Sequence, residues 1–392
     1  MCISSSEGIS VRYLFSTFLF LVLFVFAGNS FAQSIVQQLK KPMPEFEKED
    51  VAAFNKKSSV HADVPFNDQF LEYSVRLPKN WAKPQNSAIG NLSLSNKVLG
   101  EVERYYGPVR IGERSYFSLK AVELEYQLAA EQWFILFVLE NGYTLEGMEV
   151  VDNARVNTVY VLVDNGQSYV VNAAAIVNGT RIVFAQYVTP AEEWVKERSD
   201  AYHVIQSFDL KNVDTSYVEK MTPYQFLDIA ELEYPESWQL IARPLRSAEE
   251  MSVELLNVKK DKTYSYFNRQ QILKGKMEIH LIANYVVDDI DEVIREFIQK
   301  SSINQLIIQD EVEEYDDFIL DERMELVEVK AYEAVDQTQS IVNYEFWLAV
   351  MQAGEHFYFV TLLTPSRDAD YYNWARNSQT LRVVVENIVP IL

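Results

Sequence analysis

The clearest helix signal in the chain is an apolar stripe with spacings of three and four residues. Its members are Ile290, Val293, Ile294, Phe297 and Ile298. This spacing puts the side chains on one helix face, and Asp288 and Asp289 are suited to cap the first turn. The segment 129–139 is apolar on all sides, so its period does not separate a buried helix from a buried strand. We predict a buried helix there, ended by Asn141-Gly142.

Runs of branched and aromatic residues between turn residues predict strands in both halves of the chain. The predicted strands span 71–77, 98–106, 116–126, 157–163, 169–177, 181–188, 277–287, 325–331, 342–351 and 357–363. Thr189-Pro190 and Thr364-Pro365 are each predicted to start a helix, and Glu192 would complete a capping box in the first. The chain is therefore predicted to be α+β, with antiparallel sheets and helices packed on them.

Short motifs occur once in each half and in the same order. The pairs are Phe70-Leu71-Glu72-Tyr73 and Phe226-Leu227-Asp228-Ile229, Pro78-Lys79-Asn80-Trp81 and Pro235-Glu236-Ser237-Trp238, and Thr189-Pro190 and Thr364-Pro365. This echo predicts two similar domains, over residues 66–213 and 217–392. A polar, proline-broken arm is predicted over 33–65, with a short helix within 45–57. Trp81 and Trp238 are predicted to anchor the opening turn of each core.

The N-terminus has the three-part pattern of a secretory signal peptide. Arg12 precedes an apolar run from Tyr13 to Ala27, and Ser30-Phe31-Ala32 supplies small residues at the positions that signal peptidase reads. Residues 1–32 are therefore predicted to be cleaved, with an uncleaved anchor as the alternative. The apolar run is short for a membrane span, and no integral span is expected after cleavage. The expected location is periplasmic or secreted.

The composition favours an acidic protein that is held together by hydrophobic packing, without disulfides or a bound cofactor. The chain is 48% hydrophobic, carries a net charge of −22 and has one cysteine, Cys2, inside the predicted signal. The mature part therefore has no disulfide and no thiolate metal site. Its negative charge repels nucleic acid, which we do not expect as a partner. No cofactor is expected, because the chain lacks a glycine-rich nucleotide motif and a Gly-x-Ser-x-Gly turn.

The opening motifs resemble those of the PsbP-like fold, which includes photosystem extrinsic proteins and bacterial DcrB-like envelope proteins. Pro78-Lys79-Asn80-Trp81 and Pro235-Glu236-Ser237-Trp238 look like its opening turns, and Ile205-Gln206-Ser207-Phe208 looks like its closing Ser-Phe segment. In the second domain Leu381-Arg382-Val383-Val384 stands in that place, a departure from the pattern. The resemblance implies tandem domains of this α+β fold and a role in binding within larger assemblies.

Two groups of tyrosines are candidates for contact with a protein partner. Tyr105 and Tyr106 precede Gly107-Pro108, and Tyr264 and Tyr266 lie in a second aromatic group. Tyrosine combines a large contact area with a polar tip and few torsions to freeze. Because alternate strand residues face opposite ways, at least one tyrosine of each group is expected at the surface, although core packing explains them as well.

The acidic run from 310 to 328 raises the question of calcium binding. Asp316, Asp317 and Asp321 are weak candidates for metal ligands, but the Asp-x-Asp-x-Asp-Gly loop of calcium sites is missing. A solvated strand edge is the alternative. The four histidines are isolated in sequence, with no metal-binding spacing.

These observations favour a non-catalytic binding or scaffolding protein of an envelope assembly, with a protein partner in the cell envelope. Two alternatives stay open. One is a hydrolase with a site in the cleft between the domains, since triad members need not be adjacent in sequence. The other is a protein that binds its partner in a calcium-dependent way through the acidic run.

Overall fold

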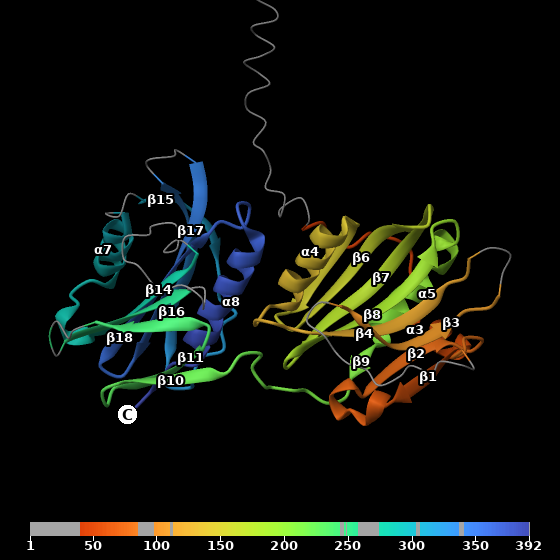
Figure 1. Cartoon of the computed structure of the whole chain (residues 1–392), viewed down its shortest axis with the longest axis horizontal. Coiled ribbons are helices and arrows are strands. Elements are labelled where there is room, and N and C mark those ends of the chain that lie inside the picture. Colours follow the sequence, from red (N-terminus) through yellow and green to blue (C-terminus); the bar gives the residue numbers. More distant parts are fainter. Residues whose placement is uncertain are drawn as a thin grey trace, which may run out of the picture. The chain divides into compact units, whose positions relative to one another are not determined.

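Figure 1 shows the computed structural model of the chain. It describes residues 40–84, 98–109, 113–243, 247, 249–257, 274–302, 306–336 and 341–391. Contacts between Cα atoms divide the chain into two units, Met1–Lys40 and Lys41–Leu392. All elements discussed below belong to the second unit. The predicted signal peptide lies outside the described residues.

The N-terminal half contains a six-stranded antiparallel sheet. In spatial order its strands are β3 (Gly100–Tyr106), β4 (Tyr116–Glu123), β8 (Arg181–Pro190), β7 (Gln167–Asn178), β6 (Arg155–Asp164) and β5 (Thr144–Asp152). Helix α4 (Ala130–Asn141) lies between β4 and β5 in the chain and packs on β6 and β7 (Figure 1). Gly142 follows it with a φ of 64°, so the predicted glycine C-cap is present.

A second layer of the N-terminal half combines helix α5 (Trp194–Ser207) with a three-stranded sheet. Its strands are β1 (Ser58–Asp63), β2 (Tyr73–Pro78) and β9 (Asp209–Leu210). The short helix α3 (Val51–Lys57) precedes β1, and the 3-10 turns η2 (Pro65–Asn67) and η3 (Gln69–Leu71) lie between β1 and β2. Helix α5 contacts β2 as well as β7 and β8. One core therefore joins this layer to the face of the large sheet opposite α4.

The C-terminal half follows the same order of elements with one more strand. Its seven-stranded sheet has the order β12 (Trp238–Ala242), β13 (Glu250–Asn257), β14 (Lys276–Ala283), β18 (His356–Pro365), β17 (Ile341–Ala353), β16 (Glu325–Asp336) and β15 (Leu306–Glu314). Its three-stranded sheet comprises β10 (Met221–Phe226), β11 (Ala230–Pro235) and β19 (Val389–Pro390). The 3-10 turn η4 (Asn284–Val286) and helix α7 (Ile290–Ser302) follow β14, and α8 (Tyr371–Glu386) packs on β18 and β11.

Helix α7 confirms the apolar stripe read from the sequence. Its predicted face packs into a cluster with Phe346, Leu348 and Phe359 of the large sheet. The α+β prediction, with antiparallel sheets and packed helices, is also confirmed. Every strand pair in the described chain is antiparallel, and all pairs join strands of the same half.

The central strand pairs β4–β8 and β14–β18 have the same register in the two large sheets. Two residues before the proline that ends each long strand, Val188 pairs with Tyr116 and Leu363 pairs with Lys276. The positions of β4 and β8 can therefore be matched to those of β14 and β18. This matching supplies an internal comparison for the residues on these strands.

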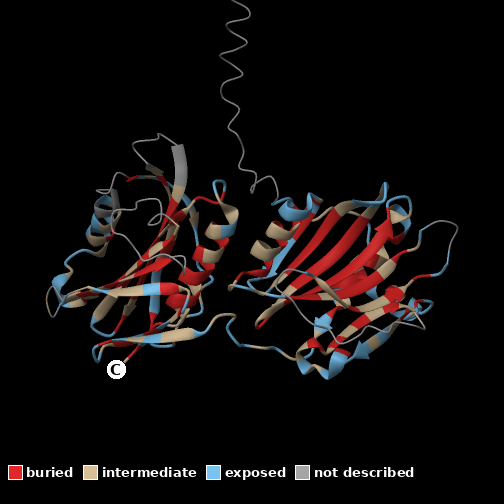
Figure 2. Ribbon diagram, in the orientation of Figure 1, coloured by how far each residue is buried: buried red, intermediate tan, exposed pale blue. Residues whose placement is uncertain are grey.

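Burial follows the layered arrangement, and Figure 2 shows the large-sheet strands of the N-terminal half mostly in the buried colour. Trp81 and Trp238 are both buried, as expected for anchors of the opening turns. The ring of Trp81 lies 4.8 Å from that of Tyr187, centroid to centroid. The two echoed Pro-x-x-Trp motifs therefore serve packing in both halves.

The predicted helix starts at the two Thr-Pro motifs are wrong. Strand β8 continues through Pro190 and β18 through Pro365, while α5 begins at Trp194 and α8 at Tyr371. No side chain caps the start of α5, so the expected capping box is absent there. Backbone pairing with the neighbouring strand outweighs the local capping signal, because it satisfies the peptide groups of the threonine in each motif.

The N-terminal arm packs more closely than its composition suggested. The carbonyl of Lys41 accepts a hydrogen bond from the backbone N–H of Met148 on β5, at 2.8 Å. Farther along, the backbone N–H of Glu49 donates to Ser199 Oγ on α5, at 2.8 Å. The predicted helix within 45–57 is confirmed only over α3.

Candidate binding surface

Tyr105 and Tyr106, adjacent on the edge strand β3, face opposite sides of the large sheet. Tyr105 is only 3% exposed and belongs to the core shared with α5. Tyr106 is half-buried and contacts a different group of residues. The alternation expected for a strand is therefore present, and it separates the two candidate residues.

The Tyr105 hydroxyl lies in a polar cluster that combines two buried tyrosines with more exposed charged side chains. It is 3.1 Å from the hydroxyl of Tyr73, and Lys83 Nζ lies 5.4 Å from the Tyr105 ring centroid. Lys83 also pairs with Asp63 at 2.6 Å and with Glu103 at 2.8 Å. Burial opposes the charge of Lys83, but these carboxylates outweigh it and raise the pKa of the ammonium group. Because its charges are paired with one another, we interpret this cluster as a contribution to the stability of the fold and not as a binding site.

On the opposite face, Tyr106 belongs to a cluster that we call the cation–tyrosine patch. Its members are Arg104, Tyr106, Arg114, Tyr116 and Lys120. Arg114 stacks on the Tyr106 ring at 3.8 Å, and Arg104 lies 4.8 Å from the Tyr116 centroid. Arg104 Nη1 also donates to the Tyr106 hydroxyl at 3.2 Å. The five side chains thus form one contiguous surface, each partly exposed.

The patch carries more positive than negative charge. Arg104 pairs with Glu101, whereas Arg114 and Lys120 form no ion pair with any residue that the structure describes. The neighbouring Glu113 interacts with Tyr169 instead. Burial lowers the pKa of Lys120, and the nearby charge of Arg104 lowers it further. Three cations therefore share one close carboxylate.

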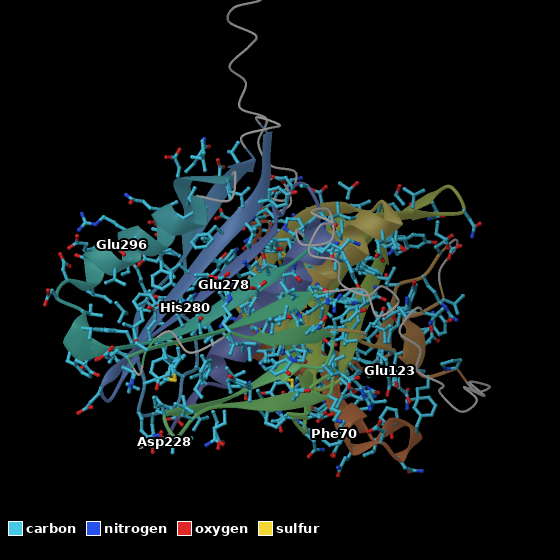
Figure 3. All side chains as sticks on the ribbon, turned by 60° about the vertical axis from the view of Figure 1, so that its left-hand side comes forward. Phe70, Glu123, Asp228, Glu278, His280 and Glu296 are labelled. Atoms are coloured by element: carbon cyan, nitrogen blue, oxygen red, sulfur yellow. The ribbon has the colours of Figure 1, made fainter. Side chains whose placement is uncertain are left out.

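The matching positions on the C-terminal sheet hold a different arrangement, which we call the β14 ion network. Its members are Arg243, Glu254, Lys276, Glu278 and His280. Arg243 bonds to both carboxylates of the network, Lys276 Nζ lies 2.7 Å from Glu278, and His280 Nε2 lies 3.2 Å from Glu278. Figure 3 labels Glu278 and His280 side by side on this strand.

Charge is balanced within the β14 ion network. Burial alone would raise the pKa of the Glu278 carboxyl, but the hydrogen bond with His280 and the charges of Lys276 and Arg243 hold it well below its usual range. His280 Nδ1 is buried without a hydrogen-bond partner among the described residues, and the ring meets Phe297 edge to face at 5.0 Å. Each carboxylate thus has a cation against it.

The remaining predicted site residues are not brought together. Tyr264 and Tyr266 lie outside the described residues. Asp321 accepts hydrogen bonds from Arg323, and Asp317 pairs with Arg382 at 2.6 Å, while Asp316 is exposed. Within the described ranges, no three His, Cys, Asp or Glu side chains are grouped so that they could hold a metal ion.

One serine–histidine contact bears on the hydrolase alternative. Ser59 Oγ lies 3.2 Å from His61 Nε2 on β1. No carboxylate among the described residues bonds to the other ring nitrogen, so the orienting acid of a triad is missing there. Burial and the charge of Lys83 lower the pKa of His61. The contact therefore gives no support to a hydrolytic site.

Sequence reasoning found Tyr106 but missed the cations around it. Arg104 and Tyr106 alternate on β3, and Tyr116 and Lys120 alternate on β4, so each strand alone shows a possible shared face. Only the register, in which Tyr106 pairs with Tyr116, brings the two strands' side chains together. That register also includes a bulge between Glu101 and Glu103, which no local sequence signal announces.

The comparisons with known proteins found similarity to solved structures. No family model and no curated protein matches the chain. A cyanobacterial PsbP from Synechocystis is 12% identical, with 43% of this chain and 98% of that one covered and a TM-score of 0.25. LpqN of Mycobacterium tuberculosis, involved in cell envelope biogenesis, is 10% identical over 42% of this chain and 98% of its own, with a TM-score of 0.27.

A longer but looser match is the immunity protein TplEi of Pseudomonas aeruginosa in complex with a peptide. It is 10% identical, with 85% of this chain and 97% of that one covered and a TM-score of 0.20. At such values the fold assignment rests on the strand order and register described above. In the described part of the chain, no helix has both the length and the apolar character needed to cross a bilayer.

Proposed function

We propose that the chain is a non-catalytic binding or scaffolding protein of the cell envelope, exported by its N-terminal signal. In this proposal residues 1–32 are removed, and tandem PsbP-like domains over 66–213 and 217–392 act outside the cytoplasm. The repeated order of elements and the matching register support the two-domain reading. The apolar N-terminal run supports export.

The cation–tyrosine patch is the observation that carries the binding role. It joins two tyrosines to three cations on one partly exposed surface. Together with tryptophan, tyrosine and arginine are the residues most enriched in the energetic centres of protein interfaces. A patch of this composition fits a contact with a protein partner, and it includes Tyr106, one of the tyrosines expected from the sequence.

Site-specific photo-crosslinking in the producing cell tests this function. A photo-reactive phenylalanine analogue would replace Tyr106 in one variant and Tyr285 in a control. Tyr285 is an equally aromatic residue that is 68% exposed in the C-terminal half. We expect a discrete protein adduct from position 106 and none from position 285. No adduct at 106, under conditions where the variant is folded and exported, would count against the proposal.

The export part of the proposal has its own measurement. Mass spectrometry of the N-terminal peptide of the protein recovered from osmotic-shock fluid should show a chain that begins at Gln33. Recovery of the full-length chain in the membrane pellet would favour the uncleaved anchor instead. Either outcome leaves the binding surface to be judged by the crosslinking result.

A further inference from the structure

We propose that the cation–tyrosine patch binds an acidic segment of a partner polypeptide, with Arg104, Arg114 and Lys120 contacting its carboxylates. The inference rests on the proposed function and adds the chemistry of the partner. Three features of the molecule support this inference. They are the unbalanced charge of the patch, the neutral β14 ion network on the other large sheet, and the placement of the arginines against the tyrosine rings.

The charge imbalance is the first feature. The protein as a whole is strongly acidic, with 57 acidic residues against 35 lysines and arginines. Within this surplus of negative charge, Arg114 and Lys120 form no ion pair among the described residues, and the one carboxylate near Lys120, Glu101, is already bonded to Arg104. Neighbouring like charges disfavour folding. An anion that enters from outside would remove this cost.

The C-terminal sheet supplies the second feature, because the same positions there are neutralised from within. By register, Arg104 opposite Ser118 corresponds to Glu254 opposite Glu278. In the C-terminal half these carboxylates are held by Arg243 and Lys276. The fold can therefore balance charge at this location without a ligand. The N-terminal half holds cations and leaves their neutralisation to a bound anion.

The geometry of the arginines favours a carboxylate-bearing polypeptide. The Arg114 guanidinium lies over the Tyr106 ring, 3.8 Å from its centroid, and forms no ion pair among the described residues, so its N–H donors can bind a planar, two-oxygen acceptor. Tyr106 and Tyr116 add apolar ring area beside the cations, with ring centroids 6.1 Å apart. Inorganic phosphate would use the cations but not the ring faces. A peptide uses both, because its side chains and backbone can cover the rings.

Fluorescence anisotropy with a defined probe tests the inference. The probe is a fluorescein-labelled hexaglutamate peptide, with hexaglutamine as the uncharged control and inorganic phosphate as competitor. We expect the mature protein to bind hexaglutamate and not hexaglutamine. Affinity should fall as salt rises, since the contact is ionic. The double variant Arg104→Gln/Arg114→Gln should bind at least about tenfold more weakly, the usual cost of losing charge-assisted contacts.

Two further variants separate binding from folding. Lys120→Met removes one cation without leaving a buried polar group, and we expect it to weaken hexaglutamate binding while the protein stays folded by circular dichroism. Arg323→Gln is the matched control, because Arg323 is an exposed arginine already paired with Asp321. We expect it to bind as the unmodified protein does.

Several results would overturn the inference. Equal binding of hexaglutamate by the unmodified protein and by both patch variants would do so, as would no hexaglutamate binding at low salt. Binding of phosphate without binding of hexaglutamate would reject the polypeptide assignment. Repeating the crosslinking at Tyr106 in the Arg104→Gln/Arg114→Gln background distinguishes the two proposals. A persisting adduct supports the binding function and rejects the acidic partner. Hexaglutamate binding without any adduct in cells supports the preference of the patch for carboxylates and counts against a protein partner at this surface.

Discussion

Arg367 and Glu345 form an ion pair in the interior of the C-terminal half. Arg367 Nε donates to Glu345 Oε1 at 2.9 Å, and the two side chains are 10% and 3% exposed. The indole N–H groups of Trp347 and Trp374 both donate to the other oxygen of Glu345. This carboxylate therefore links β17 to the N-terminal turn of α8, and each of its oxygens is satisfied.

Removing one member of this pair should be strongly destabilising. Glu345→Ala removes the acceptor of two buried indole N–H groups and of Arg367 Nε and Nη2, so that the buried guanidinium keeps, among the described residues, only its ion pair with Glu313. Breaking a buried pair in this way typically costs about 3–5 kcal/mol. We expect urea unfolding followed by circular dichroism to show a loss of that size. Glu355→Ala, at an exposed glutamate in the turn after β17, is the control and should change stability by less than about 0.5 kcal/mol. A loss below about 1 kcal/mol for Glu345→Ala would mean that water replaces the carboxylate.

The N-terminal arm depends on a glycine in the edge strand β5. A Cβ built on Gly147 would lie 2.6 Å from Pro44 Cδ and 2.7 Å from the carbonyl oxygen of Pro42. Because these contacts are too short for real atoms, Gly147→Ala should push the arm away from β5. The expected cost of such overpacking is about 1–3 kcal/mol.

Hydrogen exchange should report this displacement directly. We expect faster exchange at the Met148 amide, which donates to the Lys41 carbonyl, while the central strands keep their protection. Glu146→Ala, next to Gly147 and exposed, should leave exchange unchanged. Unaltered protection of the Met148 amide in Gly147→Ala would show that the arm can shift without detaching.

The sequence predicted the elements best where local and tertiary signals agree. The segment 129–139 was ambiguous by period, yet the Asn141-Gly142 signal identified a helix end, and α4 is a helix. Strand β5 was not predicted, because its outward positions after Met148 are exposed and its pattern is that of an edge. The Thr-Pro motifs misled for the opposite reason, since sheet pairing extends through both. Local signals fail where long-range pairing decides.

The candidate site shows the same limit. Tyr106 could be singled out from composition and its place before Gly107-Pro108, but Tyr105 could not be separated from it without knowing which face is core. The pairing of Arg104 with Glu101 and the stacking of Arg114 on Tyr106 depend on a bulge and on the β3–β4 register. A single sequence contains no marker for either, so the charge balance of the patch emerges only in three dimensions.

The β14 ion network predicts a defined response to acid. The pKa of Glu278 in the folded protein lies below the ordinary value near 4.5, so its ionised form stabilises the fold. This contribution is fully present above the unfolded pKa and is lost as pH falls toward the folded one. We therefore expect the melting temperature to fall more steeply below pH of about 4.5 in the unmodified protein than in Glu278→Gln.

Thermal melts followed across the acidic range provide the measurement, and the exposed glutamate variant Glu355→Gln should titrate like the unmodified protein. Glu278→Gln should also start from a lower stability at neutral pH, because the acceptor shared by Lys276 and His280 loses its negative charge. Parallel pH curves for the two proteins would show that the network contributes nothing to acid sensitivity.

Removing the charge of Lys120, in the cation–tyrosine patch, should stabilise the free protein, whereas removing a residue that holds the fold together would destabilise it. Burial and the charge of Arg104 depress its pKa, so the folded state disfavours its protonated form. At neutral pH the lysine therefore costs stability, and the cost disappears only as pH rises through its folded pKa toward the unfolded value of 10.5. Lys120→Met removes the charge and keeps the apolar stem, and we expect it to raise the melting temperature at neutral pH.

The difference between the two proteins should narrow as pH rises toward 10.5, because the unmodified lysine then loses its proton as well. Lys79→Met, at a lysine in the turn after β2, tests whether removing any positive charge from this acidic chain has the same effect, and we expect no stabilisation from it. A stability gain at Lys120 combined with weaker hexaglutamate binding is the signature of a residue kept for a ligand. A stability loss in Lys120→Met would instead mean that the ammonium group holds the patch together in the free protein, and the case for an incoming carboxylate would lose its energetic basis.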